Sequence, residues 1–164
     1  PRRRNMRFFD RWKKRRAAQN DDMVIKVYHA VCEKCDDGAF MEKLNAAERV
    51  LYITQKLETE VNSGGFSQFF YNTAGRFWDM LVPAFMEIGA ARTADICASA
   101  LSALGAHPLP SVSEECAALL DRLENEEVEA ALDECDNAFY EYEDDLTARN
   151  AAYIRKHKRF FDRL

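Results

Sequence analysis

The sequence predicts an all-α fold in the form of a compact single-domain bundle of about six to eight helices. Apolar residues recur at intervals of three and four along most of the chain, which is the spacing of one helix face. Alternation of apolar and polar residues, which is typical of a half-buried strand, is nearly absent. Glycine and proline residues separate the apolar segments at the points where helices would end.

Three helices are expected in the first half of the chain. Asp21 or Asp22 can cap a helix that Gly38 ends. A long helix is expected over residues 45–62, where apolar residues repeat at helical spacing, and a short apolar helix or turn is expected over residues 66–72.

Five further helical segments are expected in the second half. Pro83 either kinks the first of them or begins a new helix at its first turn. Ser111 and Glu114 have the spacing of a capping box. The expected segments are 78–90, 94–104 with Thr93 as its cap, 111–123, 132–146 and 153–161.

Charge is distributed very unevenly along the chain. Residues 1–16 carry nine Lys and Arg and one Asp, and residues 155–164 carry five Lys and Arg and one Asp. The stretch 114–145 carries 14 Asp and Glu and one Arg, which gives it a net charge of −13. We therefore divide the chain into a basic N-terminal extension, residues 1–21, and a helical domain, residues 22–164. Such asymmetry bears on partners and solubility rather than on fold.

Composition predicts a cytoplasmic protein without a transmembrane segment. Apolar residues make up 48% of the chain, but no apolar run approaches the length needed to span a bilayer. The N-terminus lacks the apolar region of a signal peptide. The five cysteines show no spacing typical of a disulfide framework, and we expect free thiols in a reducing compartment.

No metal or cofactor is expected. His29, Cys32 and Cys35 are spaced by three residues, but a structural zinc site needs four ligands, commonly in two clusters, and no second pair is present. All three lie near one helical face, where cysteine behaves as a small apolar residue. No catalytic residues can be identified from the sequence.

The first candidate binding site is a series of acidic residues that we call the acidic surface. Such a series is usually a solvated helix face. Carboxylates held on a rigid helix can also present spaced negative charge, as DNA does with its phosphates, and a DNA-binding protein could then bind them. The residues are Glu124, Glu126, Glu127, Glu129, Asp133, Glu134, Asp136, Glu141, Glu143, Asp144 and Asp145.

The second candidate is a polar corner, in which polar side chains are set among aromatic residues beside two glycines. It could be a binding cleft with convergent amide groups, for a small-molecule binder or an enzyme. It could equally be a structural turn whose side chains bond backbone groups that the turn leaves free. The residues are Glu60, Asn62, Gly64, Gly65, Gln68 and Asn72.

The basic ends give a third alternative. Aromatic residues interleaved with arginine suit both nucleic acids and anionic lipids, so the protein could be a peripheral nucleic-acid or membrane binder. The basic ends could instead neutralise the acidic residues, within one chain or across a homodimer. The segment Arg7–Arg11 recurs as Arg159–Arg163, without a longer repeat around it.

The segment Glu60-Val61-Asn62-Ser63-Gly64-Gly65-Phe66, continued by Gln68-Phe69-Phe70 and Asn72, resembles a motif of a bacterial family of helical domains. The best-known member of that family is a DNA-mimic protein. Tyr52-Ile53, Ile88-Gly89, Leu132-Asp133 and Phe139-Tyr140 support the resemblance, which covers residues 22–161, whereas Ser63 stands where the family usually has asparagine.

The resemblance implies an all-α fold and, through that one member, an acidic surface that binds a transcription regulator in place of DNA. We therefore expect a non-enzymatic binding protein whose acidic surface engages a basic protein partner, with a DNA-binding transcription regulator as the candidate. The acidic body itself is not expected to bind DNA directly, because like charges repel.

Overall fold

The computed structural model describes residues 2–73, 76–105, 124–162 and 164, and for residues 2–13 it describes the backbone alone. Within these residues there are helices and no strands, so the predicted all-α class is confirmed. The elements are α1 (Arg2–Cys35), η1 (Met41–Lys43), α2 (Ala46–Thr73), α3 (Trp78–Glu87), α4 (Ala91–Ala103), α6 (Glu126–Tyr140), α7 (Leu146–Lys156) and η2 (Lys158–Phe160).

Two compact units make up the chain, and they differ in charge. Pro1–Arg49 and Asp145–Leu164 form the first, which carries 19 Lys and Arg against ten Asp and Glu. Val50–Asp144 forms the second, which carries four Lys and Arg against 18 Asp and Glu. The net charges are +9 and −14, and we call the two the basic unit and the acidic unit.

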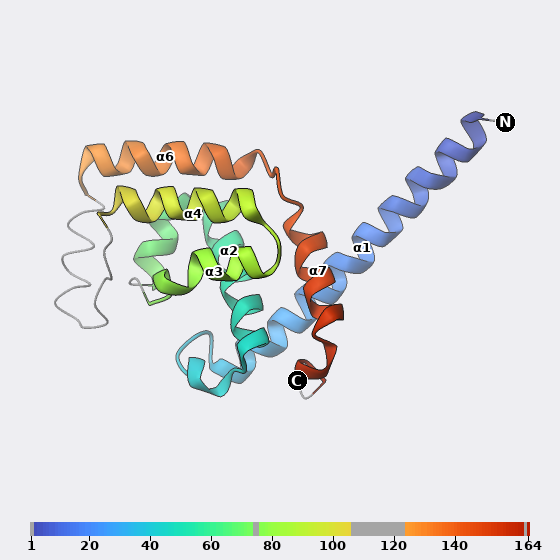
Figure 1. Cartoon of the computed structure of the whole chain (residues 1–164), viewed down its shortest axis with the longest axis horizontal. Helices are drawn as coiled ribbons and strands as arrows, with labels where there is room; N and C mark the ends of the chain where they lie inside the picture. The colour runs from blue at the N-terminus through green and yellow to red at the C-terminus, as the bar shows by residue number, and fades with distance from the viewer. Residues whose placement is uncertain (1, 74–75, 106–123, 163) are drawn as a thin grey trace. The chain divides into compact units, whose positions relative to one another are not determined.

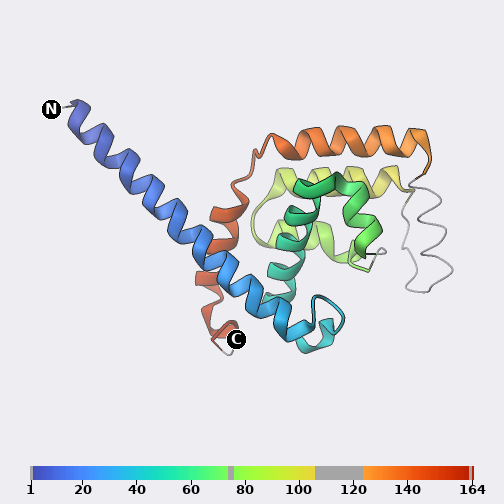
Figure 2. The same cartoon turned by 180° about the vertical axis from the view of Figure 1, so that it is seen from behind.

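In the basic unit, α1 packs against α7, and both views of the ribbon show the two helices in contact (Figures 1 and 2). Val24, Val31 and Ile154 belong to the apolar core of this unit. A partly buried ion pair anchors the start of α2 to α1: Lys34 Nζ lies 2.7 Å from Oε1 of Glu48, whose side chain is fully buried, while the Lys34 side chain is 33% exposed. Apolar packing and this ion pair both help to hold the unit.

Asn45 and Glu48 form a reciprocal cap at the beginning of α2. The Glu48 carboxylate accepts the Asn45 backbone N–H at 2.8 Å, and the Asn45 side chain accepts the Glu48 N–H at 3.0 Å. This is the capping-box arrangement, with asparagine as the capping residue. It satisfies two backbone donors that a helix start leaves without partners.

In the acidic unit, α4 lies between α3 and α6 and packs against both (Figure 1). Its core is largely aromatic, and the rings meet edge to face or tilted, as aromatic pairs prefer. Phe66, for example, lies with its ring centroid 6.1 Å from that of Phe139 on α6. Other buried core residues are Tyr52, Phe69, Phe70, Phe77, Trp78, Leu81, Phe85 and Leu132.

Several predicted helix limits are wrong. The last helix, expected over residues 153–161, is α7 from Leu146 to Lys156, followed by the short η2. No helix begins at Asp21 or Asp22, because good helix formers such as Ala17, Ala18 and Gln19 continue α1 through this point. Thr93 is not the cap of α4, which begins at Ala91. The expected helix over residues 132–146 is interrupted after Tyr140, as described below. The helix expected over residues 111–123 lies outside the described residues.

The chain turns between α6 and α7 through Tyr142, whose φ is +47°, a left-handed backbone angle. Asp145 then begins α7, and its side chain accepts the Ala148 N–H at 2.9 Å. Apolar residues at helical spacing continue across this turn, which is why periodicity alone predicts one long helix.

Candidate functional site

A kink at two glycines divides α2, at the point where a helix end was expected. Gly65 has a φ of +76°, which glycine adopts without strain, whereas Gly64 is extended with a φ of −169°. A side chain at position 65 would also overlap the carboxylate of Asp136. Backbone angle and available space therefore both require glycine at position 65.

The Glu60 carboxylate is the centre of the polar corner. Its Oε2 accepts hydrogen bonds from Gln68 at 2.9 Å and Asn72 at 2.7 Å, and Lys56 Nζ lies 3.3 Å from its Oε1. Burial by itself would raise the pKa of Glu60, but these donors and the charge of Lys56 hold it below its ordinary value. The network joins the helix before the kink to the helix after it.

Asp136 connects α6 to the same kink. Its Oδ1 accepts the backbone N–H of Phe66 at 2.7 Å. Phe66 is the first residue after the kink, so its N–H is among those without a partner in the helix, and a carboxylate is favoured there. Burial raises the pKa of Asp136, the Phe66 N–H opposes this, and the charge of Asp133 raises the pKa further.

Two tyrosines at and beyond the end of α6 fix the segment before the kink. The Tyr140 hydroxyl donates to the carbonyl oxygen of Val61 at 2.8 Å. The Tyr142 hydroxyl accepts a hydrogen bond from Asn62 Nδ2 at 2.6 Å and donates to Glu58 at 3.2 Å. Burial raises the pKa of both tyrosine hydroxyls. The polar groups of the corner thus bond one another or these tyrosines, which favours a structural role over a ligand cleft.

The acidic surface is centred on α6, and its outward side chains lie opposite a buried stripe. Leu132, Cys135 and Phe139 are buried, at intervals of three and four residues. Glu126, Glu127, Asp133 and Glu134 are exposed, and at 100° per residue they fall on the side of the helix away from this stripe, while the exposed Glu129 lies at its flank. No lysine or arginine occurs in α6. The helix therefore presents an acidic face without a basic side chain, on which Ala130 and Asn137 are exposed among the carboxylates.

The spacing of these charges can be compared with that of DNA. The 15 residues of α6 span about 22 Å at 1.5 Å per residue. Its five exposed carboxylates therefore lie roughly one per 4 to 5 Å of axis, against about 3.4 Å per phosphate along one DNA strand. The linear charge density approaches that of a single strand.

Other members of the acidic surface have bonds within the fold. Asp144 is buried, and its Oδ2 accepts the Thr93 backbone N–H at 2.9 Å and lies 3.2 Å from the Thr93 hydroxyl. This bond satisfies a free N–H at the start of α4 and explains why no local cap is needed there. Glu143 is exposed and pairs with Arg92 at 3.1 Å.

The structure thus divides the eleven predicted residues into two groups. Four have specific partners in the described structure: Asp136, Glu143, Asp144 and Asp145. The other seven are exposed at the surface: Glu124, Glu126, Glu127, Glu129, Asp133, Glu134 and Glu141. The second group can meet a partner without loss of these internal bonds.

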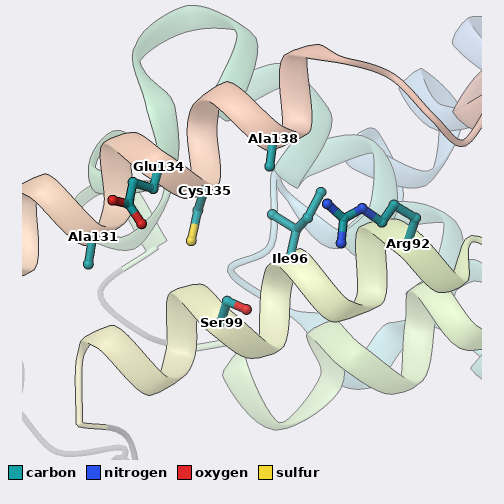
Figure 3. Close-up of a pocket in the computed structure, with 7 residues that line it drawn as sticks. All are labelled: Arg92, Ile96, Ser99, Ala131, Glu134, Cys135 and Ala138. Atoms are coloured by element: carbon teal, nitrogen blue, oxygen red, sulfur yellow. The ribbon is translucent and has the colours of Figure 1, made fainter.

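A groove of about 280 Å³ runs between α4 and α6, and Figure 3 shows that both helices contribute its side chains. Arg92, Ile96 and Ser99 come from α4, and Glu134 and Cys135 come from α6. The polar corner does not line it. Burial raises the pKa of the Cys135 thiol, with Asp136 and Glu134 adding to the effect, so the reactive thiolate is disfavoured.

Cysteine and histidine form no evident centre in the described part of the chain. Cys32, Cys35, Cys97 and Cys135 are free thiols, and within the same residues no group of three or more His, Cys, Asp or Glu side chains is placed to hold a metal ion. The Cys35 sulfur lies 3.3 Å from the Gly38 backbone nitrogen, where it accepts a hydrogen bond at the end of α1. The described helices include none long and apolar enough to cross a membrane.

Sequence reasoning missed the residues that hold the acidic unit together around the kink. Tyr140, Tyr142 and Thr93 act through contacts with residues about 50 to 80 positions away, and no local pattern signals them. By contrast, the cap formed by Asn45 and Glu48 has a recognisable local signal, the spacing of a capping box.

A model of the family described as DMP19-like protein matches residues 42–157. The chain belongs to the DMP19-like protein family. The match covers the kink, the groove between α4 and α6 and the acidic surface, and it excludes residues 1–41, which contain the whole of α1. It is shorter than the range of the resemblance, 22–161, and agrees with it in family. No curated protein and no solved structure matches the chain.

Proposed function

We propose that this DMP19-like protein is a binding protein whose acidic surface engages a basic protein partner in place of DNA. The observation that carries the proposal is the acidic face of α6, which contains no basic side chain and whose average charge per length of axis approaches that of one DNA strand. The partner proposed is a DNA-binding transcription regulator, in keeping with the family's DNA mimicry.

The α6 geometry supports this function in two ways. The side chains Leu132, Cys135 and Phe139 are buried, so the opposite face of the helix keeps a fixed orientation. The kink holds α6 as well, because Asp136 bonds the Phe66 N–H and Tyr140 bonds the Val61 carbonyl. A rigid arrangement of charges can bind with less loss of conformational entropy than a mobile acidic segment.

Charge reversal on α6 tests the proposal. The fourfold variant changes Glu126, Glu127, Glu129 and Glu134 to Lys, all of them exposed residues without structural bonds in the described part of the chain. The matched control changes four exposed acidic residues elsewhere to Lys, with the same change in net charge. The control positions are Asp22, Glu33, Glu87 and Asp95.

Both variants and the original protein are used to capture partners from a lysate of the native cell, at low and at physiological salt. We expect the original protein and the control to capture a DNA-binding protein that added duplex DNA releases. The α6 variant should lose it. Capture should also weaken as salt rises, because exposed charges are screened over about 8 Å at physiological ionic strength. Equal recovery by the α6 variant, or a partner that duplex DNA does not displace, would contradict DNA mimicry.

A further inference from the structure

A second charged surface lies in the basic unit, where a groove of about 410 Å³ is lined by Arg15, Arg16, Gln19 and Arg155. The first three belong to α1 and the last to α7, two helices that pack against each other. No acidic and no apolar side chain lines this groove. Ten of the eleven acidic-surface residues belong to the other unit, and the eleventh, Asp145, does not line this groove.

The Arg155 guanidinium is held in place by a neutral group. Its Nη2 donates to Oδ1 of Asn20 at 2.6 Å, and Asn20 is a buried residue, 7% exposed. An amide partner orients a guanidinium without cancelling its charge, whereas a carboxylate would do both. One donor of five is used in this bond, so further N–H groups are available to an anion.

The groove has the chemistry of a phosphate site. Guanidinium groups present paired donors that match phosphate oxygens, and several of them in one concave site bind adjacent anionic groups. Arg15 and Arg16 are exposed, and they approach from a different helix than Arg155. The basic unit as a whole carries a net charge of +9, which draws a polyanion toward the groove.

We propose that this groove binds the phosphodiester backbone of a nucleic acid, without reading its base sequence. Basic residues extend beyond the groove past the end of α7, where Lys158 and Arg159 are exposed. There the Arg159 guanidinium lies 4.7 Å from the ring centroid of Phe160, which is itself 38% exposed and can stack against a base. A membrane-binding surface would require an apolar face beside the basic residues, and the groove has none.

The test measures binding of the full chain to a fluorescein-labelled single-stranded oligothymidine by fluorescence anisotropy, between 50 and 200 mM salt. The test variant is Arg15→Gln with Arg16→Gln. The matched control is Lys26→Gln with Lys43→Gln, two exposed residues of the same unit outside the groove. Circular dichroism verifies that each variant is folded.

We expect the Arg15 and Arg16 double variant to weaken binding about tenfold at 50 mM salt and to reduce the slope of log K against log salt by about 1.4, since each contact to a single strand contributes about 0.7. The control should change affinity less than about threefold. Arg155→Lys keeps the positive charge but removes the planar guanidinium with its paired N–H donors. It should therefore weaken binding without changing the salt slope.

Several results would overturn the proposal. Equal weakening by the two double variants would show that net charge acts without the groove. Tighter binding to vesicles of phosphatidylserine and phosphatidylcholine than to the oligonucleotide would assign the groove to a membrane. The chain could also fail to bind the oligonucleotide and instead self-associate in a way that the Arg15 and Arg16 variant abolishes. That result would assign the groove to binding the acidic surface of a second copy. None of these results depends on whether α6 binds a regulator.

Discussion

The acidic unit and the basic unit stabilise their buried carboxylates with different kinds of partner. In the acidic unit, the Glu60 carboxylate is surrounded mainly by amide donors, and Asp136 and Asp144 bond backbone N–H groups. In the basic unit, Glu48 is fully buried and has a lysine as its partner. The buried carboxylates of the acidic unit therefore rely mainly on neutral amide and backbone donors, whereas the buried carboxylate of the basic unit has a charged partner.

This difference has a consequence for stability. The acidic unit depends on many hydrogen bonds around one irregular point of the backbone, the kink at Gly65. In the basic unit, the pair of Lys34 and Glu48 lies at the junction of two helices. A substitution at Gly65 should therefore destabilise the acidic unit by straining its backbone. A substitution of Lys34 should destabilise the basic unit by leaving the Glu48 carboxylate without its countercharge.

The largest effect is expected at the kink. Gly65→Ala should lower the free energy of unfolding by about 3 kcal/mol, because it combines a left-handed backbone angle with an overlap against Asp136. Gly64→Ala is the control: its φ is extended, and the added methyl overlaps the Gln68 side chain and disturbs only the bond from Gln68 to Glu60, so the loss should be about 1 kcal/mol. Urea denaturation measures both, and equal losses would contradict the role assigned to the backbone angle.

The ion pair of Lys34 and Glu48 should give the next largest effect. Lys34→Met leaves the buried Glu48 carboxylate with its Asn45 bond and without its countercharge, which should cost about 2 kcal/mol. The same change at Lys26, an exposed residue on the same helix, should alter the free energy of unfolding by less than about 0.5 kcal/mol. If the two thermal denaturation curves shift equally, this ion pair contributes little to the basic unit.

A pH titration separates Glu60 from Asp136. The pKa of Glu60 is lowered in the folded protein, so its contribution is present at neutral pH and is lost as the pH falls through that pKa. The pKa of Asp136 is raised, so its contribution has the opposite sign and increases as the pH falls. Below pH 4.5, Glu60→Gln should therefore lose less stability on acidification than the original protein does. Parallel loss in both proteins, measured by urea denaturation, would contradict the role of the Glu60 network.

The smallest effect on stability is expected on the exposed face of α6. Glu126, Glu127 and Glu129 lie in the first turn, where acidic residues favour the helix, but they also repel one another. Changing the three to Gln should alter the free energy of unfolding by less than about 1 kcal/mol in either direction. Asp136→Asn should cost more than this whole set, because it weakens the bond at the kink. A thermal denaturation series compares the two.

The helices and the kink could be predicted from the sequence because their causes are local. Apolar periodicity indicates the helices, and a pair of glycines after a long helix indicates the break at Gly64 and Gly65. The sequence does not show which glycine of the pair adopts a positive φ, and the structure places it at Gly65. The all-α class follows from the same local signals.

The candidate binding surface could be predicted only as a list of acidic residues. Sequence shows that Asp136 and Asp144 are acidic, but their bonds to Phe66 and Thr93 join segments far apart in the chain. For the same reason, the break after Tyr140 is hidden, since Tyr142 and Leu146 continue the apolar spacing across a turn. The basic groove likewise depends on residues from α1 and α7 that sequence does not bring together.

The two groups of acidic residues should also evolve differently. On α6, an acidic residue can be lost at position 126 or 129 and gained at a neighbouring exposed position without a change in the total charge of the face. Neither Glu126 nor Glu129 has a structural bond in the described part of the chain. Asp136 cannot be replaced from a neighbouring position in this way. Its carboxylate has to reach the Phe66 N–H, and it occupies the space that a side chain at position 65 would fill. Among relatives, the net charge of this segment should therefore vary independently of Asp136, and a relative that has lost its mimic surface should still retain aspartate there.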